Sequence, residues 1–75
     1  MDDKFINLIS EELLIELSEV TRELELDSTE NWDSLAVISV ITAIDEIYDI
    51  QVDDEKLLVC KTVGEVYELI ENDLS

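Results

Sequence analysis

The sequence predicts an all-α protein, a small antiparallel four-helix bundle with three longer helices, one short helix and a long loop between the first two. Apolar residues recur every three or four positions in three separate stretches, and polar capping residues precede two of them. Proline is absent and Gly64 is the one glycine, so caps and changes in periodicity mark the boundaries between elements. With 75 residues and a hydrophobic content of 47%, we expect one domain, residues 1–75, and a folded chain despite a net charge of −17.

The first helix is expected over about residues 3–20. Its apolar side chains recur at helical spacing on one side: Ile6, Ile9, Leu13, Leu17 and Val20. Over residues 21–32 this periodicity fails, and the sequence predicts a loop of about a dozen residues. Because so long a loop is uncommon in a compact domain, we expect Leu24 and Leu26 to pack it onto the bundle.

The second helix is expected to begin at Asp33 or Ser34 and to end near Tyr48. Asp33 is the expected N-cap, and Trp32 is placed to pack against Val37 as a hydrophobic staple. The predicted core face carries Val37, Val40, Ile41, Ile44, Ile47 and Tyr48. The opposite face carries Leu35, Ile38, Ser39, Thr42, Asp45 and Glu46. Two large apolar side chains close to Ser34 should therefore point away from the core.

The third helix is expected to be short. The fourth is expected to be longer, and the sequence marks its start more clearly. After a polar break, residues 54–60 can form one or two turns around Leu57 and Leu58. Thr62 and Glu65 then have the spacing of a capping box, which predicts the start of the last helix. The apolar residues of that helix continue at helical spacing: Val63, Val66, Tyr67, Ile70 and Leu74.

Ser34 stands at the start of the most apolar of these helices. A serine that acts as a nucleophile needs a neighbouring base, and the chain contains no histidine. None of the basic residues lies beside Ser34 in sequence: Lys4, Arg22, Lys56 and Lys61. The sequence therefore predicts no catalytic residue, and it predicts that Ser34 is a hydroxyl that another enzyme modifies.

The charge of the chain excludes several kinds of partner. With 21 acidic and 4 basic residues, the chain repels nucleic acid and anionic membranes and attracts basic protein surfaces. We therefore expect no nucleic acid binding and no membrane insertion. Zinc-type metal sites need clusters of cysteine and histidine, so none is expected. Cys60 is the single cysteine, which excludes an internal disulfide, and no signal peptide is evident, so we expect a cytoplasmic protein. We also expect a monomer, and we expect Cys60 to be a partly buried apolar residue.

Asp33-Ser34-Leu35 at a helix start, together with the long preceding loop and the acidic composition, resembles the acyl carrier protein family. The resemblance extends from Phe5 to Leu74. It implies that Ser34 is esterified with 4′-phosphopantetheine, which a phosphopantetheinyl transferase takes from coenzyme A. It also implies that the thiol of this arm carries acyl groups as thioesters, so that the protein is a carrier and not an enzyme.

The resemblance also implies a recognition surface for acyl-loading and acyl-transferring enzymes. In the family, the residues that match Leu35 and Ile38 pack against partner enzymes. Acidic residues along the same helix meet basic docking patches on those enzymes. In this sequence Asp33, Asp45 and Glu46 match such acidic positions.

Three positions of the second helix depart from the general fatty-acid carriers. Ala36 and Ser39 stand where those carriers commonly have acidic residues, and Thr42 replaces a common methionine. These departures, with Trp32 before the motif, favour a stand-alone carrier of a dedicated polysaccharide, lipid-modification or secondary-metabolite pathway. An aminoacyl, peptidyl or D-alanyl carrier is an alternative with the same prosthetic chemistry. An acidic protein-interaction module is an alternative of a different class, and it leaves the placement of Ser34 unexplained.

Overall fold

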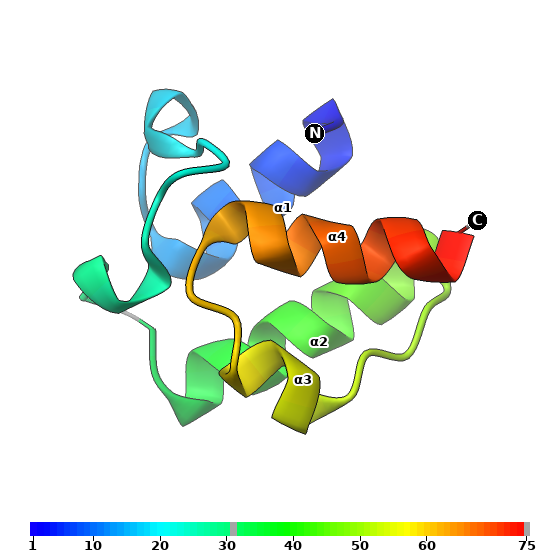
Figure 1. Ribbon diagram of the computed structural model, residues 1–75. Coiled ribbons are helices and arrows are strands. Elements are labelled where there is room, and N and C mark those ends of the chain that lie inside the picture. The colour runs from blue at the N-terminus through cyan, green and yellow to red at the C-terminus, as the bar shows by residue number, and fades with distance from the viewer. Residues whose placement is uncertain (31, 75) are drawn as a thin grey trace.

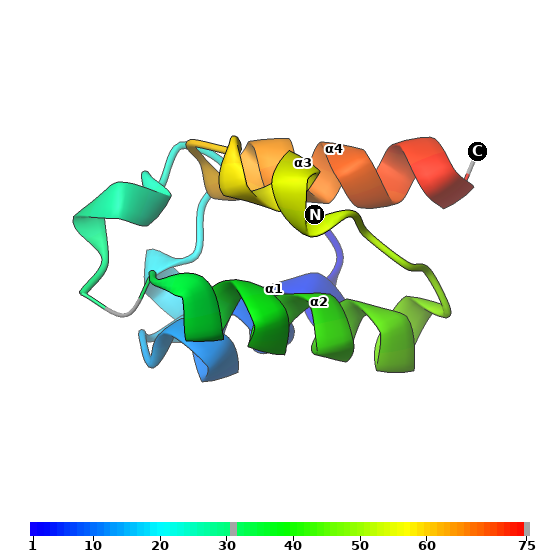
Figure 2. The same cartoon turned by 90° about the horizontal axis from the view of Figure 1, so that it is seen from below.

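The fold is all-α, with the helices arranged in two layers. The computed structural model describes residues 1–30 and 32–74, residue 74 by its backbone alone. The α-helices are α1 (Asp3–Leu13), α2 (Ser34–Tyr48), α3 (Asp54–Leu58) and α4 (Val63–Leu74), and two 3-10 helices, η1 (Leu17–Glu19) and η2 (Leu26–Ser28), lie between α1 and α2. Figure 1 shows the long α1–α2 connection at one end of the molecule, and Figure 2 shows α1 and α2 in one layer with α3 and α4 in the other. Three longer helices and one short helix confirm the predicted fold class.

The core lies between the two layers and is built from apolar side chains. Its buried members are Phe5, Leu8, Ile9, Leu13, Val20, Leu26, Ala36, Val37, Val40, Ile44, Ile50, Leu57, Val63, Val66 and Ile70. Within residues 1–30 and 32–73 no polar or charged side chain is buried. Since burial of each large aliphatic side chain stabilises a fold by about 1.5–3 kcal/mol, the apolar stripes of α1, α2 and α4 supply the main stabilising interaction.

Helix α1 ends at Leu13, well before Val20, so the predicted length of the first helix was wrong. Leu14 adopts the left-handed conformation with φ 56°, and the amide of Ile15 donates to the carbonyl of Ser10 over 3.1 Å. The hydroxyl of Ser10 donates in return to the carbonyl of Ile15 over 2.6 Å. Glycine is the usual residue at such a helix end, so a leucine there gave no stop signal in the sequence.

The α1–α2 connection is fixed to the start of α4. Leu26 is buried and Leu24 is half-buried, which confirms that these leucines pack the loop onto the bundle. The amide of Val63 donates to the carbonyl of Leu24 over 3.0 Å, and the amide of Gly64 donates to the carbonyl of Arg22 over 3.1 Å. A Cβ on Gly64 would lie 3.1 Å from the Arg22 carbonyl oxygen, so a glycine suits this close approach.

Helix α4 begins with the predicted capping box. The carboxylate of Glu65 accepts from the amides of Lys61 over 2.7 Å and Thr62 over 3.1 Å, while the hydroxyl of Thr62 accepts from the amide of Glu65 over 3.3 Å. These two backbone hydrogen bonds to its carboxylate lower the pKa of Glu65. The side chain of Leu74, predicted on the apolar stripe of this helix, lies outside the described residues.

Asp2 connects three helices, a link that the sequence did not reveal. Its carboxylate caps α1 by accepting from the amide of Phe5 over 2.9 Å, and it accepts from the hydroxyls of Tyr48 over 2.7 Å and Tyr67 over 3.4 Å. Partial burial raises the pKa of Asp2, but these hydrogen bonds together outweigh that effect and leave the pKa below its ordinary value. The ionised carboxylate therefore stabilises the fold.

Replacement of Asp2 should destabilise the protein in a pH-dependent way. We expect Asp2→Ala to lower the free energy of unfolding at pH 7 by about 1–2 kcal/mol in urea denaturation, because the cap and the tyrosine hydrogen bonds are lost. Since the pKa of Asp2 is lower in the folded than in the unfolded chain, the difference from wild type should be full above about pH 4 and disappear as the pH falls through the folded-state value.

The matched control for this experiment is Asp3→Ala, which removes the same charge one residue further along. Asp3 lies in the first turn of α1 and is exposed. We expect a loss of less than about 0.5 kcal/mol, typical of an exposed charge near a helix start. Equal losses in the two variants would contradict the role given to Asp2.

Candidate functional site

The start of α2 is set by Asp33, as predicted. Asp33 has an extended backbone, with φ −136° and ψ −173°, and its side chain accepts from the amide of Ala36 over 2.9 Å. The carbonyl of Asp33 accepts from the amide of Val37 over 3.0 Å, which begins the helical hydrogen-bond pattern. Ser34 is therefore the first residue of α2, and it is exposed.

The two faces of α2 match the predicted division, with two differences: Ala36, which was on neither predicted face, is buried, and Ile47 is exposed. Its buried residues are Ala36, Val37, Val40 and Ile44. Leu35 and Ile38 lie on the outer face, where they are 75% and 59% exposed. Ile47 was predicted on the core face, but it lies in the last turn, at the edge of the core, and is 42% exposed. Ser34 thus has two solvent-exposed apolar neighbours on its own helix.

The acidic residues proposed for recognition are separated along α2. Asp33 directly precedes Ser34 and uses its carboxylate as the helix cap. Asp45 and Glu46 are exposed, but Asp45 lies about 16 Å from Ser34 along the helix axis at 1.5 Å per residue. The structure brings Leu35 and Ile38 together with Ser34, whereas it places Asp45 and Glu46 toward the other end of the helix.

Helix α3 lies beside the start of α2 and contributes to the surroundings of Ser34. A hollow of about 130 Å³ is lined by Ser34, Val37 and Ile38 from α2 and by Asp54 and Leu58 from α3. Successive residues of a helix point about 100° apart, so a helix of five residues cannot bury two consecutive leucines on one face. The spacing therefore predicts that one of Leu57 and Leu58 is exposed, but it does not identify Leu58 or place it beside Ser34.

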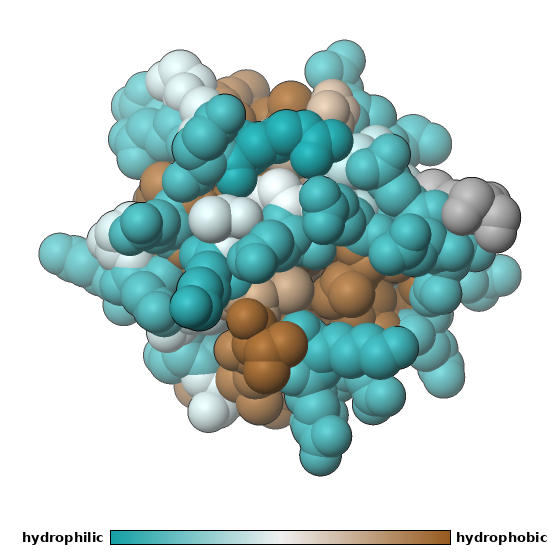
Figure 3. All heavy atoms as spheres, in the orientation of Figure 1, coloured by the Kyte–Doolittle hydropathy of each residue, from teal (hydrophilic) through white to brown (hydrophobic). Residues whose placement is uncertain are grey.

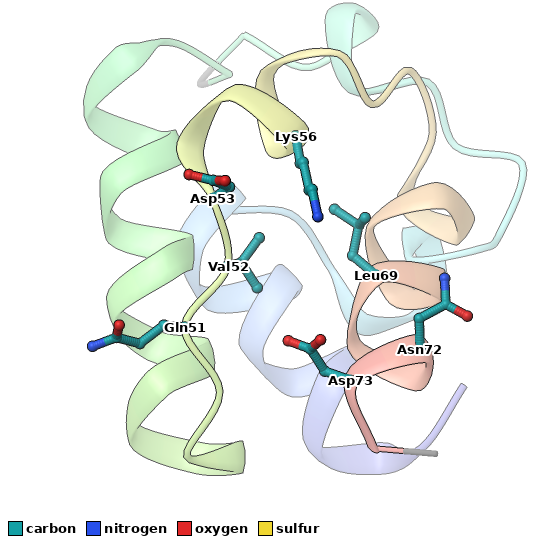
Figure 4. Close-up of a pocket in the computed structure, with 7 residues that line it drawn as sticks. All are labelled: Gln51, Val52, Asp53, Lys56, Leu69, Asn72 and Asp73. Atoms are coloured by element: carbon teal, nitrogen blue, oxygen red, sulfur yellow. The ribbon is translucent and has the colours of Figure 1, made fainter.

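A second hollow lies between the α2–α3 connection, α3 and the end of α4. Its volume is about 430 Å³, and its lining residues are Gln51, Val52, Asp53, Lys56, Leu69, Asn72 and Asp73. Figure 4 shows Lys56 and Asp73 directed toward this hollow from opposite sides. Ser34 is not among the residues that line it, so this larger hollow is separate from the serine site.

Cys60 has the character of an apolar residue, as predicted. It is half-buried, and its thiol donates to the carbonyl of Lys56 over 3.4 Å. Burial first, and then the negative charges of Glu65 and Glu68, raise the pKa of Cys60 to about 11. The thiol is therefore protonated near neutral pH and is a poor nucleophile.

Neither a metal centre nor a membrane span is found in the described part of the chain. No group of three or more histidine, cysteine, aspartate or glutamate side chains there is arranged to hold a metal ion. No described helix has both the length and the apolar character that crossing a bilayer requires. The chemical group that stands out at the surface is the hydroxyl of Ser34, exposed at a capped helix start beside an apolar hollow.

Residues 3–70 match the family model for a phosphopantetheine attachment site. The chain belongs to this phosphopantetheine-binding carrier family. The acyl carrier proteins of Porphyromonas gingivalis are 30% identical over 99% of this chain and 95% of theirs. The acyl carrier protein of Coprothermobacter proteolyticus is 29% identical over 91% of this chain and 83% of its own. The solution structure of a holo acyl carrier protein from Nitrosomonas europaea superposes with a TM-score of 0.79 at 27% identity, over 99% of this chain and 98% of the other.

Membership in the family confirms the resemblance seen in the sequence. The chain is an acyl carrier protein, a carrier and not a catalyst, and its cofactor is 4′-phosphopantetheine. An exposed hydroxyl at a helix start fits this group, because the first-turn amides and the helix dipole favour the negative charge of a phosphodiester. When bound, the arm supplies a thiol at the end of a flexible tether.

Cys60 of the unmodified carrier should react slowly with a disulfide reagent. With a pKa of about 11, only a small fraction of the thiol is ionised at pH 8, so we expect a rate roughly tenfold or more below that of free cysteine. Unfolding in urea should restore the ordinary rate, and Cys60→Ala should abolish the reaction. A rapid reaction of the folded, unmodified chain would show that Cys60 is an exposed, reactive thiol.

Proposed function

We propose that Ser34 is the residue that carries the phosphopantetheine arm in a stand-alone acyl carrier protein. The thiol of the arm then holds acyl intermediates as thioesters and delivers them to successive enzymes. The observation that carries this proposal is the position of Ser34 directly after the Asp33 cap, exposed and beside the hollow between α2 and α3. A tethered cargo reaches each active site by a local search rather than by free diffusion.

Comparison with the other described serines supports Ser34. The hydroxyls of Ser10 and Ser28 each donate to a backbone carbonyl 2.6 Å away and stabilise local turns. Ser18 is exposed, but it is the middle residue of the three-residue 3-10 helix η1. Ser39 is exposed, but it lies within α2 rather than at its start. Ser34 therefore combines exposure with the helix N-terminus that favours a phosphodiester.

The attachment reaction needs chemistry that the chain itself does not provide. The Oγ of Ser34 forms a new bond to the β-phosphorus of coenzyme A, and the bond to the adenosine 3′,5′-bisphosphate leaving group breaks. The hydroxyl proton must pass to a base, and the chain has no histidine to accept it. The phosphopantetheinyl transferase is the partner that supplies this base and the coenzyme.

The further partners that we propose are acyl-loading and acyl-transferring enzymes of a dedicated pathway. Ala36 and Ser39 leave the first half of α2 without the acidic residues of the general fatty-acid carriers, which supports a specialised set of enzymes. Basic patches on such enzymes would meet Asp45 and Glu46 at the far end of α2. A cytoplasmic location and a monomeric state belong to the same proposal. Aminoacyl, peptidyl and D-alanyl cargo use the same arm, and loading assays with each cargo distinguish them.

The attachment site can be tested by intact mass after incubation with coenzyme A and a broad-specificity phosphopantetheinyl transferase. Wild type should gain the mass of one arm, and Ser34→Ala should gain none, because the acceptor hydroxyl is absent. Ser34→Ala should keep its helical circular dichroism, since Asp33 and not Ser34 caps the helix.

Ser39→Ala is the matched control, because Ser39 is an exposed serine on the same helix. It should be modified as fully as wild type. Modification of Ser34→Ala, or loss of modification in Ser39→Ala, would overturn the assignment. Failure of wild type to accept the arm from any active transferase would overturn the proposed function itself.

A further inference from the structure

Leu14 has a backbone conformation that leucine disfavours, and its side chain gains little burial there. It ends α1 in the left-handed region, with φ 56° and ψ 45°. A β-carbon makes this region unfavourable, so glycine or asparagine is usual at such a helix end. The other non-glycine residue with a positive φ in the described part of the chain is Asp49, and aspartate tolerates this region. The side chain of Leu14 is 77% exposed, so core packing does not explain a leucine at this position.

The turn that contains Leu14 is held by other groups. The amides of Leu14 and Ile15 both donate to the carbonyl of Ser10, and the hydroxyl of Ser10 donates to the carbonyl of Ile15. Ile15 is half-buried and packs against the core. All of these interactions would remain if glycine replaced Leu14. A residue that contradicts its local backbone preference without a gain in packing is commonly a functional one.

A second exposed leucine follows three residues later. Leu17 begins η1, none of whose residues is buried, and it is 53% exposed. The sequence predicted Leu17 on the core side of a longer first helix, and the early end of α1 exposes it instead. Three residues of chain span at most about 11 Å, so the two leucines lie close together. On the face drawn in Figure 3 apolar side chains appear in small groups among hydrophilic ones, and such groups can mark binding surfaces.

Glutamates flank these leucines on both sides, and no basic residue does. Residues 5–21 contain no lysine or arginine. The one ion pair found within residues 1–30 and 32–73 joins Arg22 to Glu71, so the flanking glutamates have no cationic partner there. We use the name α1-end surface for Leu14 and Leu17 together with these four glutamates: Glu11, Glu12, Glu16 and Glu19. It is an apolar centre within an acidic ring.

The α1-end surface lies at the same end of the molecule as Ser34 but on different elements. The hydrogen bond between Tyr48 and Asp2 places the start of α1 beside the end of α2, and Figure 2 shows the end of α1 toward the start of α2. Glu12 lines a hollow together with residues of the first half of α2. Neither leucine lines the hollow beside Ser34. A protein bound to the α1-end surface therefore need not cover the serine.

We propose that the α1-end surface is a docking site for a partner protein that presents apolar side chains ringed by lysine or arginine. Leu14 and Leu17 lose water against the apolar centre of the partner, and the glutamates pair with its basic ring. The same glutamates repel nucleic acid and anionic membranes, and a second copy of the chain would bring like charges together. This inference does not depend on Ser34 as the attachment residue.

Replacement of Leu14 by glycine should stabilise the protein if the leucine serves binding rather than folding. We expect Leu14→Gly to raise the melting temperature by about 4 °C, because relief of the backbone strain outweighs the greater freedom of glycine in the unfolded chain. The matched control Leu14→Ala keeps a β-carbon and therefore the strain, so it should melt within about 2 °C of wild type. A melting temperature of Leu14→Gly at or below that of wild type would show that the leucine stabilises the fold, and it would overturn the proposal.

Binding is tested by NMR titration of the isotope-labelled full chain with two synthetic helical peptides in about 0.15 M salt. One peptide has leucine on one face and lysine elsewhere, and the other has serine in place of the leucines. The leucine–lysine peptide should shift the backbone amides of residues 11–19, and the serine–lysine peptide should bind there about tenfold more weakly. Leu14→Ala and Leu17→Ser should each weaken binding of the first peptide about tenfold, because one buried leucine contact is lost.

The control variant Ile47→Ser removes an exposed isoleucine near the other end of α2 and should leave these shifts unchanged. Equal binding of the two peptides would show that charge alone acts, and unchanged affinity in both leucine variants would show that the leucines do not take part. Shifts confined to residues around Ser34 would place the binding elsewhere. Self-association of wild type that Leu14→Ala abolishes would assign the surface to a second copy. Each of these results would overturn the proposal, whereas failure of arm transfer to Ser34 would leave it unaffected.

Discussion

The buried face of α2 is the constraint on which the position of the site depends. Val37, Val40 and Ile44 are buried between the layers, and each contributes about 1.5–3 kcal/mol through burial. With three side chains anchored at helical spacing, the helix cannot rotate about its axis without exposing them. Leu35 and Ile38 must then face solvent. The orientation of the serine site is thus a consequence of core packing, while surface charges contribute little to it.

The Asp33 cap adds the second constraint, which fixes where the helix begins. A start one residue later or earlier would turn the first residue of α2 by about 100°. The capping hydrogen bond to Ala36 excludes that shift and leaves Ser34 at the first helical position. Together the cap and the buried face hold one hydroxyl at a defined place. Under the proposed function, the transferase supplies the reactive chemistry, because the chain has no histidine to act as a base.

Features with local signals were predictable from the sequence, and features that depend on distant residues were not. The cap of α2 and the Thr62–Glu65 capping box follow from residues three positions apart, and both were predicted correctly. The end of α1 was missed because Leu14 holds a conformation that usually calls for glycine. The hydrogen bond between Asp2 and Tyr48 joins residues 46 positions apart, and the exposure of Leu58 depends on how α3 packs. Neither follows from periodicity.

Attachment of the arm to the first residue of α2 is tested most directly by tandem mass spectrometry of peptides from the modified protein. Fragment ions on either side of Ser34 should place the whole added mass on that residue, within Asp33-Ser34-Leu35, and every other hydroxyl should be unmodified. Added mass on Ser39, or on any serine or threonine outside this motif, would contradict the claim that the capped helix start defines the site.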